Sequence, residues 1–213
     1  DSLSMAAKVG SETVKSPGTL VVSTYAPCPD IRAKVTPDFK GPASNIDTSI
    51  VWINIEGKFR LGASALAQAY VQQGNDCPNL TRSDILVKAF KVTQQLLQKN
   101  LLLAGHDISD GGLLISLVEM ALSGLSGVDV DITKVVTELA EPNATTGSLS
   151  QSEIAVLYAE ECGWLIEVRT ADILTVQNEL DNAGVPNFLI GKTQGYGLQS
   201  PILISSRGNM ILV

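Results

Sequence analysis

The sequence lacks the features that are typical of membrane, secreted and nucleic-acid-binding proteins. No apolar run reaches the roughly 18 residues that span a bilayer, and the N-terminus lacks the basic-then-apolar order of a secretory signal. Fifteen basic residues stand against 22 acidic ones, without any cluster of Lys or Arg, so the chain offers no electrostatic footprint to an anionic backbone or surface. We therefore expect no nucleic acid and no membrane among its partners.

Cysteine and histidine are also scarce. The three cysteines, Cys28, Cys77 and Cys162, are odd in number, widely spaced and form no Cys-x-x-Cys pair, which argues against a disulfide framework and a structural zinc site. This indicates a reducing compartment, so we expect the cytoplasm and leave an organelle open. The only histidine, His106, follows an apolar run, where a structural, hydrogen-bonded role is favoured over proton transfer.

What is present is an ordinary globular composition, with 213 residues of which 45% are hydrophobic. Apolar periodicity predicts strands at 20–26, 50–56, 128–132, 164–168 and 188–190, a closing hairpin of 201–204 with 210–213, and helices at 61–70, 83–100, 113–122, 134–140 and 170–184. This order predicts an α+β fold, a mixed β-sheet with packed helices. We expect a single domain, 1–213, in which 1–16 are the tail of a preceding lobe and 17–213 form the lobe itself.

Some expectations concern the position of individual strands. The strand at 50–56 is apolar on both faces and should be central, whereas the alternation at 128–132 predicts an edge of the sheet. The strand-helix-strand unit at 164–190 resembles half of a ferredoxin-like fold. Trp52 and Trp164 lie in predicted strands and should belong to the core.

Other expectations concern the ends of helices. Ser83 and Thr170 should cap the helices that follow them. The helix at 83–100 should bury a stripe formed by Ile85, Ala89, Val92 and Leu96. Residues 141–148 have the composition of a loop, which we expect to be mobile.

The most informative stretch is the polar turn HDISDGG at residues 106–112, which follows an apolar run and opens a predicted helix. Backbone N–H groups are unpaired at a helix N-terminus, and the helix dipole favours an anion there. Two carboxylates, a hydroxyl and a glycine pair in this place predict a site for a phosphate or a metal. The alternative for Asp107 and Asp110 is helix capping.

Two further candidates give weaker signals. Gly62, Ala63 and Ser64 form a strand-to-helix turn that could receive the phosphate of a substrate at Gly62 and Ser64, although plain strand-helix packing is favoured. Glu160 and Glu161 could form a carboxylate pair for acid-base chemistry. A solvated pair at the start of a strand is the commoner explanation.

Several blocks resemble the large, single-chain phosphoribosylformylglycinamidine synthase family. They are DSLSMA (1–6), SPGTLVVS (16–23), VTPD (35–38), LGASALAQ (61–68) and HDISDGG (106–112). The match is to the C-terminal lobe of the second half that is similar to aminoimidazole-ribonucleotide synthetase, and it covers nearly the whole chain. In the family Gly and Lys precede the first block, so the resemblance implies a fragment of a larger enzyme.

The resemblance implies an ATP-dependent amidation in purine biosynthesis. Glutamine is hydrolysed in a separate domain of this family, and the ammonia replaces an amide oxygen of formylglycinamide ribonucleotide after ATP has activated that oxygen. The implied partners are the preceding synthetase lobe and the glutaminase domain of the same parent chain. No cysteine lies in a Gly-x-Cys-x-Gly elbow, so we expect no glutaminase activity and no catalysis by the isolated chain.

Residue by residue, Asp107 matches the magnesium-ligand aspartate of the family, and Ser109 matches a serine that contacts the nucleotide. Magnesium takes one or two carboxylates together with phosphate oxygens, which suits a site shared with another lobe. Gly111 and Gly112 would let backbone N–H groups approach the nucleotide closely, and Asp110 is left as the helix cap. The implied cofactors are ATP and magnesium, and no catalytic residue is expected in this lobe.

Two roles stay open for this half-site. It either takes part in turnover or is a structural nucleotide site that stabilises the synthase, because the two halves of the family are pseudo-equivalent. Other ATP-dependent members of the superfamily, such as thiamine-monophosphate kinase or selenophosphate synthetase, are distant alternatives.

Overall fold

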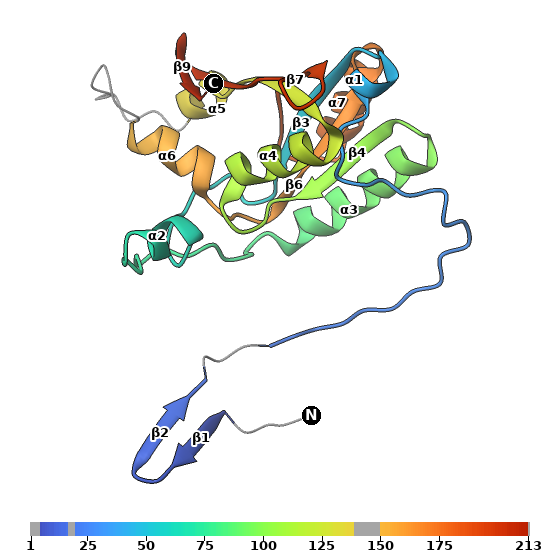
Figure 1. Ribbon diagram of the computed structural model, residues 1–213. Coiled ribbons are helices and arrows are strands. Elements are labelled where there is room, and N and C mark those ends of the chain that lie inside the picture. Colours follow the sequence, from blue (N-terminus) through green and yellow to red (C-terminus); the bar gives the residue numbers. More distant parts are fainter. Residues whose placement is uncertain (1–4, 17–19, 139–149, 213) are drawn as a thin grey trace. The chain divides into compact units, whose positions relative to one another are not determined.

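The computed structural model describes residues 5–16, 20–138 and 150–212. The chain divides into two compact units, Asp1–Arg32 and Ala33–Val213. The first unit contains an antiparallel hairpin of β1 (Ala6–Val9) and β2 (Glu12–Lys15), drawn in blue in Figure 1. Sequence reasoning missed this hairpin, and the predicted division after residue 16 stays a prediction.

The strand predicted at 20–26 is wrong. The segment has no regular secondary structure, and Leu20, Val21 and Val22 are 86%, 83% and 71% exposed. A β-rich composition describes side chains that fit a pleated, half-buried surface. Within the described residues no neighbouring strand pairs with this segment, so its backbone has no ladder to join.

The second unit is built on a seven-stranded sheet in the order β4-β6-β3-β7-β5-β8-β9. Neighbouring strands are antiparallel except for β5 and β8, which run parallel. The predicted mixed sheet is therefore confirmed. Its strands are β3 (Thr48–Asn54), β4 (Leu102–Asp107), β5 (Ser126–Asp131), β6 (Gly163–Arg169), β7 (Asn187–Tyr196), β8 (Ile202–Ser206) and β9 (Asn209–Leu212).

β3 is central, as predicted, but the prediction that β5 forms an edge of the sheet is wrong. All seven residues of β3 are buried, and the strand lies between β6 and β7. β5 is also internal, because β7 pairs with one side of it and β8 with the other. The alternation arises because Asp129 and Asp131 lie on the more exposed face of the sheet. Alternation distinguishes the two faces of a strand and does not show whether the strand lies at an edge.

Helices cover both faces of the sheet (Figure 1). Leu113 and Leu117 of α4 join a core on one face with Ile50 and Trp52 of β3. The opposite core holds the neighbouring strand residues with α3 and α7. The helices are α1 (Gly41–Ser44), α2 (Ala65–Ala69), α3 (Ser83–Gln98), α4 (Gly112–Gly124), α5 (Thr133–Glu138), α6 (Gln151–Tyr158) and α7 (Ile173–Asn182), which the 3-10 turn η1 (Thr170–Asp172) precedes.

The interior of α3 was predicted better than the helix ends. Its predicted stripe is the set of residues that it buries, but its N-cap is Arg82, which has no side-chain cap, so the cap predicted at Ser83 is wrong. Thr170 lies in η1, where its hydroxyl is 3.0 Å from that of Ser49 and caps nothing. Contacts with distant residues hold the chain where local caps were expected. Arg82 donates its N–H to Glu56, and Thr170 contacts Ser49.

The helices at 61–70 and 151–158 also differ from expectation. α2 is confined to Ala65–Ala69, and the side chains of Tyr70 and Val71 are 71% and 95% exposed. α6 was missed, although Ser150 and Glu153 form a complete capping box at its start. The loop predicted at 141–148 lies outside the described residues.

The C-terminal elements agree with prediction. β6 and β7 both run antiparallel to β3, which separates them, so β6-α7-β7 is a split strand-helix-strand unit of the ferredoxin-like kind. β8 and β9 form the predicted hairpin. Trp52 is 1% exposed in the core, and Trp164 packs partly buried against the opposite core.

No helix in the described part of the chain is long and apolar enough to cross a membrane.

Candidate functional site

The 106–112 turn joins the end of an edge strand to the start of a buried helix. Asp107 is the last residue of β4, and α4 begins at Gly112. Gly111 and Gly112 have φ values of +90° and +72°, a region that glycine adopts without a steric cost. The glycine pair is therefore required by the turn itself.

The predicted helix cap at Asp110 is wrong. Gly111 is the N-cap of α4, and no side chain of the capping kind bonds there. Its left-handed backbone departs from the extended conformation that a side-chain cap normally requires. Instead, the Gly111 N–H donates to Glu160 Oε1 over 2.8 Å, so a carboxylate distant in the sequence takes the place of the local cap.

Further contacts fix the backbone of the turn. The Ile108 N–H donates to the Gly163 carbonyl over 2.9 Å. The buried Ser116 hydroxyl lies 3.1 Å from the Gly112 carbonyl and 3.3 Å from that of Asp107. The Gly112 N–H donates to the Ser109 carbonyl over 2.9 Å. The backbone of the turn is therefore fixed by Glu160 and Gly163 from outside α4 and by Ser116 from within it.

The Asp107 side chain projects from this fixed backbone. It is 82% exposed, and its carboxylate lies 3.5 Å from His106 Nδ1. The His106 ring is only 16% exposed, with Nε2 3.3 Å from the Glu119 carboxylate and Nδ1 2.6 Å from the Asp107 carbonyl. These contacts fit the structural role predicted for the histidine, and they leave the Asp107 carboxylate facing solvent.

A single exposed carboxylate fits a share of a magnesium site and does not make a whole one. In residues 5–16, 20–138 and 150–212, no group of three or more His, Cys, Asp and Glu side chains is placed to hold a metal ion. Magnesium keeps several waters and commonly takes one or two carboxylates together with substrate phosphates. The chemistry of Asp107 is therefore compatible with one ligand of a site that is completed elsewhere.

The turn at Gly62–Ser64 uses its polar groups internally. The Gly62 N–H donates to the Asp76 carbonyl over 2.9 Å, and the Ala63 N–H donates to the Gln73 carbonyl over 2.7 Å. The buried Ser64 hydroxyl donates to the Leu61 carbonyl over 2.7 Å and caps α2. These bonds tie the turn to the 73–76 loop and to the start of α2, and the substrate phosphate stays an untested prediction.

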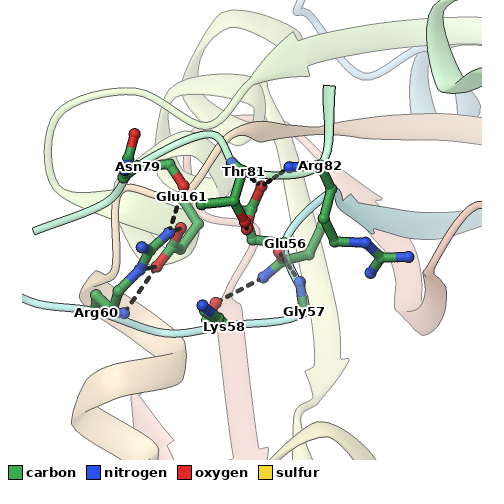
Figure 2. A network of polar contacts seen from close by, with 9 residues as sticks. Glu56, Gly57, Lys58, Arg60, Asn79, Thr81, Arg82 and Glu161 are labelled. Carbon is green, nitrogen blue, oxygen red and sulfur yellow. Dashed lines mark hydrogen bonds and ion pairs between the residues drawn. The ribbon is translucent and has the colours of Figure 1, made fainter. Parts of the chain in front are cut away.

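Glu160 and Glu161 separate into two structural roles. Glu160 Oε1 accepts from Gly111 and also from the Ala65 N–H at the start of α2, each over 2.8 Å. Glu161 is 2% exposed and forms a bidentate pair with Arg60, at 2.6 Å to Nε and 2.7 Å to Nη2. Figure 2 shows this pair with Arg60 reaching on to the Asn79 carbonyl. The favoured prediction, a solvated pair, is wrong, because Glu161 is buried, Glu160 is half-buried, and both accept hydrogen bonds from the protein.

A second carboxylate in Figure 2 was not singled out from the sequence. Glu56, just beyond the end of β3, accepts from the N–H groups of Thr81 and Arg82 at 2.7 and 2.8 Å, and from the Thr81 hydroxyl at 2.6 Å. The Thr81 hydroxyl bond is the largest influence on the carboxyl, whose pKa falls from 4.5 to about 2. The hydrogen bond to Glu161 raises the pKa of Arg60. Glu56 therefore stays ionised at neutral pH, and the two glutamates together hold the connection between β3 and α3.

Residues 53–200 match the protein family described as AIR synthase related protein, C-terminal domain. The chain belongs to this family. As a member of the AIR synthase related family, it is 57% identical over 212 residues to phosphoribosylformylglycinamidine synthase of Drosophila melanogaster, a match that covers 100% of this chain and 16% of that protein. The human synthase is 41% identical over 212 residues, which are 100% of this chain and 15% of the human protein.

These relatives confirm the resemblance that the sequence blocks indicated. The chain spans only 16% and 15% of the length of these two curated relatives. A relative from Arabidopsis thaliana, described as probable and as chloroplastic/mitochondrial, is 40% identical over 192 residues, which are 90% of this chain and 12% of the plant protein.

Solved structures with this AIR synthase related fold include PurL of Thermotoga maritima. PurL complexed with FGAR has a TM-score of 0.61 at 12% identity, over 85% of this chain and 28% of PurL. PurL complexed with ATP has a TM-score of 0.57 at 11% identity, over 85% of this chain and 26% of PurL. At this identity the likeness establishes the fold alone, and the predicted fold class is confirmed.

Proposed function

We propose that this chain is the C-terminal lobe of one synthetase-like half of a phosphoribosylformylglycinamidine synthase. In that enzyme, ATP and glutamine-derived ammonia convert formylglycinamide ribonucleotide into the amidine. The observation that carries the proposal is the 57% identity to the Drosophila synthase across the whole chain. The complexes of PurL with ATP and with FGAR, proteins of the same fold, support nucleotide and substrate as its ligands.

Within this function, the lobe contributes Asp107 as one magnesium ligand and Ser109 as a nucleotide contact. The Asp107 side chain is 82% exposed, so its carboxylate is accessible to a metal ion. Gly111 and Gly112 serve the site through their backbone conformation, because their N–H groups already donate to Glu160 and Ser109. Magnesium, when bound, would neutralise negative charge on the phosphoryl group that is transferred.

The remaining magnesium ligands and the glutaminase nucleophile come from the preceding lobe and the glutaminase domain of the parent chain. For the metal, this proposal is supported by the absence, among the described residues, of any group of three or more His, Cys, Asp and Glu side chains that could hold an ion. The chain alone should therefore form no amidine from ATP, magnesium, formylglycinamide ribonucleotide and ammonia. We place the enzyme in the cytoplasm, as its reduced cysteines suggest.

The test is Asp107→Asn in the whole synthase, with Asp110→Asn as the matched control. Both carboxylates lie on the same turn, and Asp110 neither caps α4 nor matches a metal ligand. Amidine formation is measured at increasing magnesium, and bound nucleotide is measured after denaturation. Removing an outer-shell partner of a metal site typically costs about 10- to 100-fold in metal affinity or activity. Because Asp107 is proposed as a direct ligand, we expect Asp107→Asn to lose at least that much, and Asp110→Asn to behave as the wild type.

Together with the assembly state and melting temperature of each variant, these two measurements also separate turnover from a structural site. Lost synthesis with normal assembly supports a catalytic half-site, whereas loss of bound nucleotide together with stability supports a structural one. If Asp107→Asn changes neither the magnesium dependence nor the bound nucleotide, the proposed site is wrong.

A further inference from the structure

Residues 158–163, here called the clamp segment, connect the end of α6 to the start of β6. The segment contacts the 106–112 turn at three points. Glu160 Oε1 accepts from the Gly111 N–H over 2.8 Å, and the Gly163 carbonyl accepts from the Ile108 N–H over 2.9 Å. At the third point, a Cβ added to Gly112 would come within 2.7 Å of the Tyr158 backbone, so the two backbones are in direct contact.

The clamp segment holds the 60–65 segment as well. Glu160 Oε1, the same oxygen that accepts from Gly111, accepts from the Ala65 N–H over 2.8 Å. Next to it, Glu161 accepts from the Arg60 N–H over 3.0 Å and from its guanidinium. One half-buried carboxylate oxygen therefore joins the starts of α2 and α4.

This arrangement restricts where the 106–112 turn can lie. Hydrogen bonds to an ionised acceptor are short and about twice as strong as neutral ones. Because Glu160 is anchored beside the Arg60–Glu161 pair, a shift of the 106–112 turn must stretch the bond to Gly111 or carry α2 with it. A contact of this kind orients the groups that bind a ligand without touching the ligand itself.

We propose that Glu160 is a positioning residue for the nucleotide half-site, fixing the 106–112 turn relative to the 60–65 segment. The inference rests on the proposed function, because Asp107 and Ser109 are the groups that the turn would carry to magnesium and nucleotide. Glu160 takes no part in the chemistry. Its role is to hold one backbone N–H in each of two turns at the same oxygen.

The experiment compares Glu160→Ala and Glu160→Gln in the whole synthase. Alanine removes the acceptor for both N–H groups, whereas the amide oxygen of glutamine can still accept them. Glu153→Ala is the matched control, because Glu153 is an acceptor in the capping box of α6 and contacts neither turn. Hydrogen exchange is followed in peptides that cover 61–68 and 107–114, and binding of magnesium with AMPPCP is measured by titration.

We expect Glu160→Ala to speed exchange in both peptides and to weaken magnesium-AMPPCP binding on the order of 10- to 100-fold. Glu160→Gln should stay close to the wild type. Glu153→Ala should lower the melting temperature while leaving exchange in the two peptides and the affinity unchanged. A purely structural Glu160 would lower the melting temperature in the same way, without the loss of affinity.

The proposal is overturned if Glu160→Ala leaves exchange unchanged in either peptide, or leaves the affinity unchanged. Failure of the proposed function has a different signature. In that case Asp107→Asn has no effect on magnesium-AMPPCP binding, whatever the Glu160 variants do to exchange.

Discussion

Replacing Gly112 by alanine should destabilise the second unit far more than the same change at Gly184. The two glycines have almost the same φ, +72° and +69°. Alanine in the left-handed region costs about 1–2 kcal/mol, and this cost is common to both sites. The smaller gain from a stiffer unfolded chain is also common to both.

The sites differ in the space around the added methyl group. At Gly184 nothing lies within 4 Å of the new Cβ, whereas at Gly112 it meets Tyr158 backbone atoms at 2.7 and 2.8 Å and the Ala159 carbonyl at 2.9 Å. Backbone atoms cannot rotate aside as a side chain does, so α4 or the clamp segment must move. Overpacking of this kind costs about 1–3 kcal/mol. We expect a loss of about 1–2 kcal/mol for Gly184→Ala and about 2–5 kcal/mol for Gly112→Ala.

Urea unfolding followed by tryptophan fluorescence measures this difference. The sequence has two tryptophans, Trp52 and Trp164, and both lie in strands of the second unit, so the signal reports on the unit that contains both glycines. Coincident transitions by fluorescence and circular dichroism establish two-state behaviour. Equal losses at the two sites would refute the reasoning, because only the close approach to the clamp segment distinguishes them.

Two further predictions concern the network in Figure 2. The folded pKa of Glu56 lies at about 2, below its usual value of 4.5, so its contribution to stability is complete above pH 4.5 and is lost as the pH falls toward 2. Glu56→Gln should flatten this acid limb in urea unfolding at a series of pH values, and parallel curves would contradict the assignment. Arg60→Met leaves the Glu161 carboxylate, 2% exposed, without its partner and should cost about 3–5 kcal/mol. Lys99→Met removes the exposed pair with Glu179 and should cost at most about 1 kcal/mol, so similar losses for the two would count against a buried pair.

Sequence reasoning succeeded where a pattern reports on burial alone. The stripe of α3 and the apolar run of β3 were read correctly, because a side chain that faces a core is apolar whatever element covers it. The failures at 20–26 and at β5 share one cause. Both depend on whether another strand lies alongside, and strand composition carries no record of that neighbour.

At the candidate site, too, local features were predicted and long-range contacts were not. The turn at 106–112 was located from its composition and from the family blocks, because both are local. The contacts that hold it were not, since Glu160 is 49 residues from Gly111 and 95 from Ala65. The cap was predicted at Asp110 because the family resemblance assigns Asp107 to magnesium, whereas in the structure the left-handed Gly111 is the N-cap and its N–H donates to Glu160 of another element.

Long-range carboxylates explain how irregular segments are fixed around this sheet. Glu56 holds the backbone of 81–82, Glu160 that of Gly111 and Ala65, and Glu167 the N–H groups of Lys40 and Gly41. These acceptors lie in or beside the sheet strands, and their donors lie in loops or at helix starts, where N–H groups have no partner in regular structure. An apolar contact tolerates small slides, whereas a charge-assisted hydrogen bond fixes a distance and a direction. The proposed function makes the same demand, because Asp107 would have to keep a fixed position relative to metal ligands from another lobe, and the half-buried Glu160 holds the turn that carries Asp107.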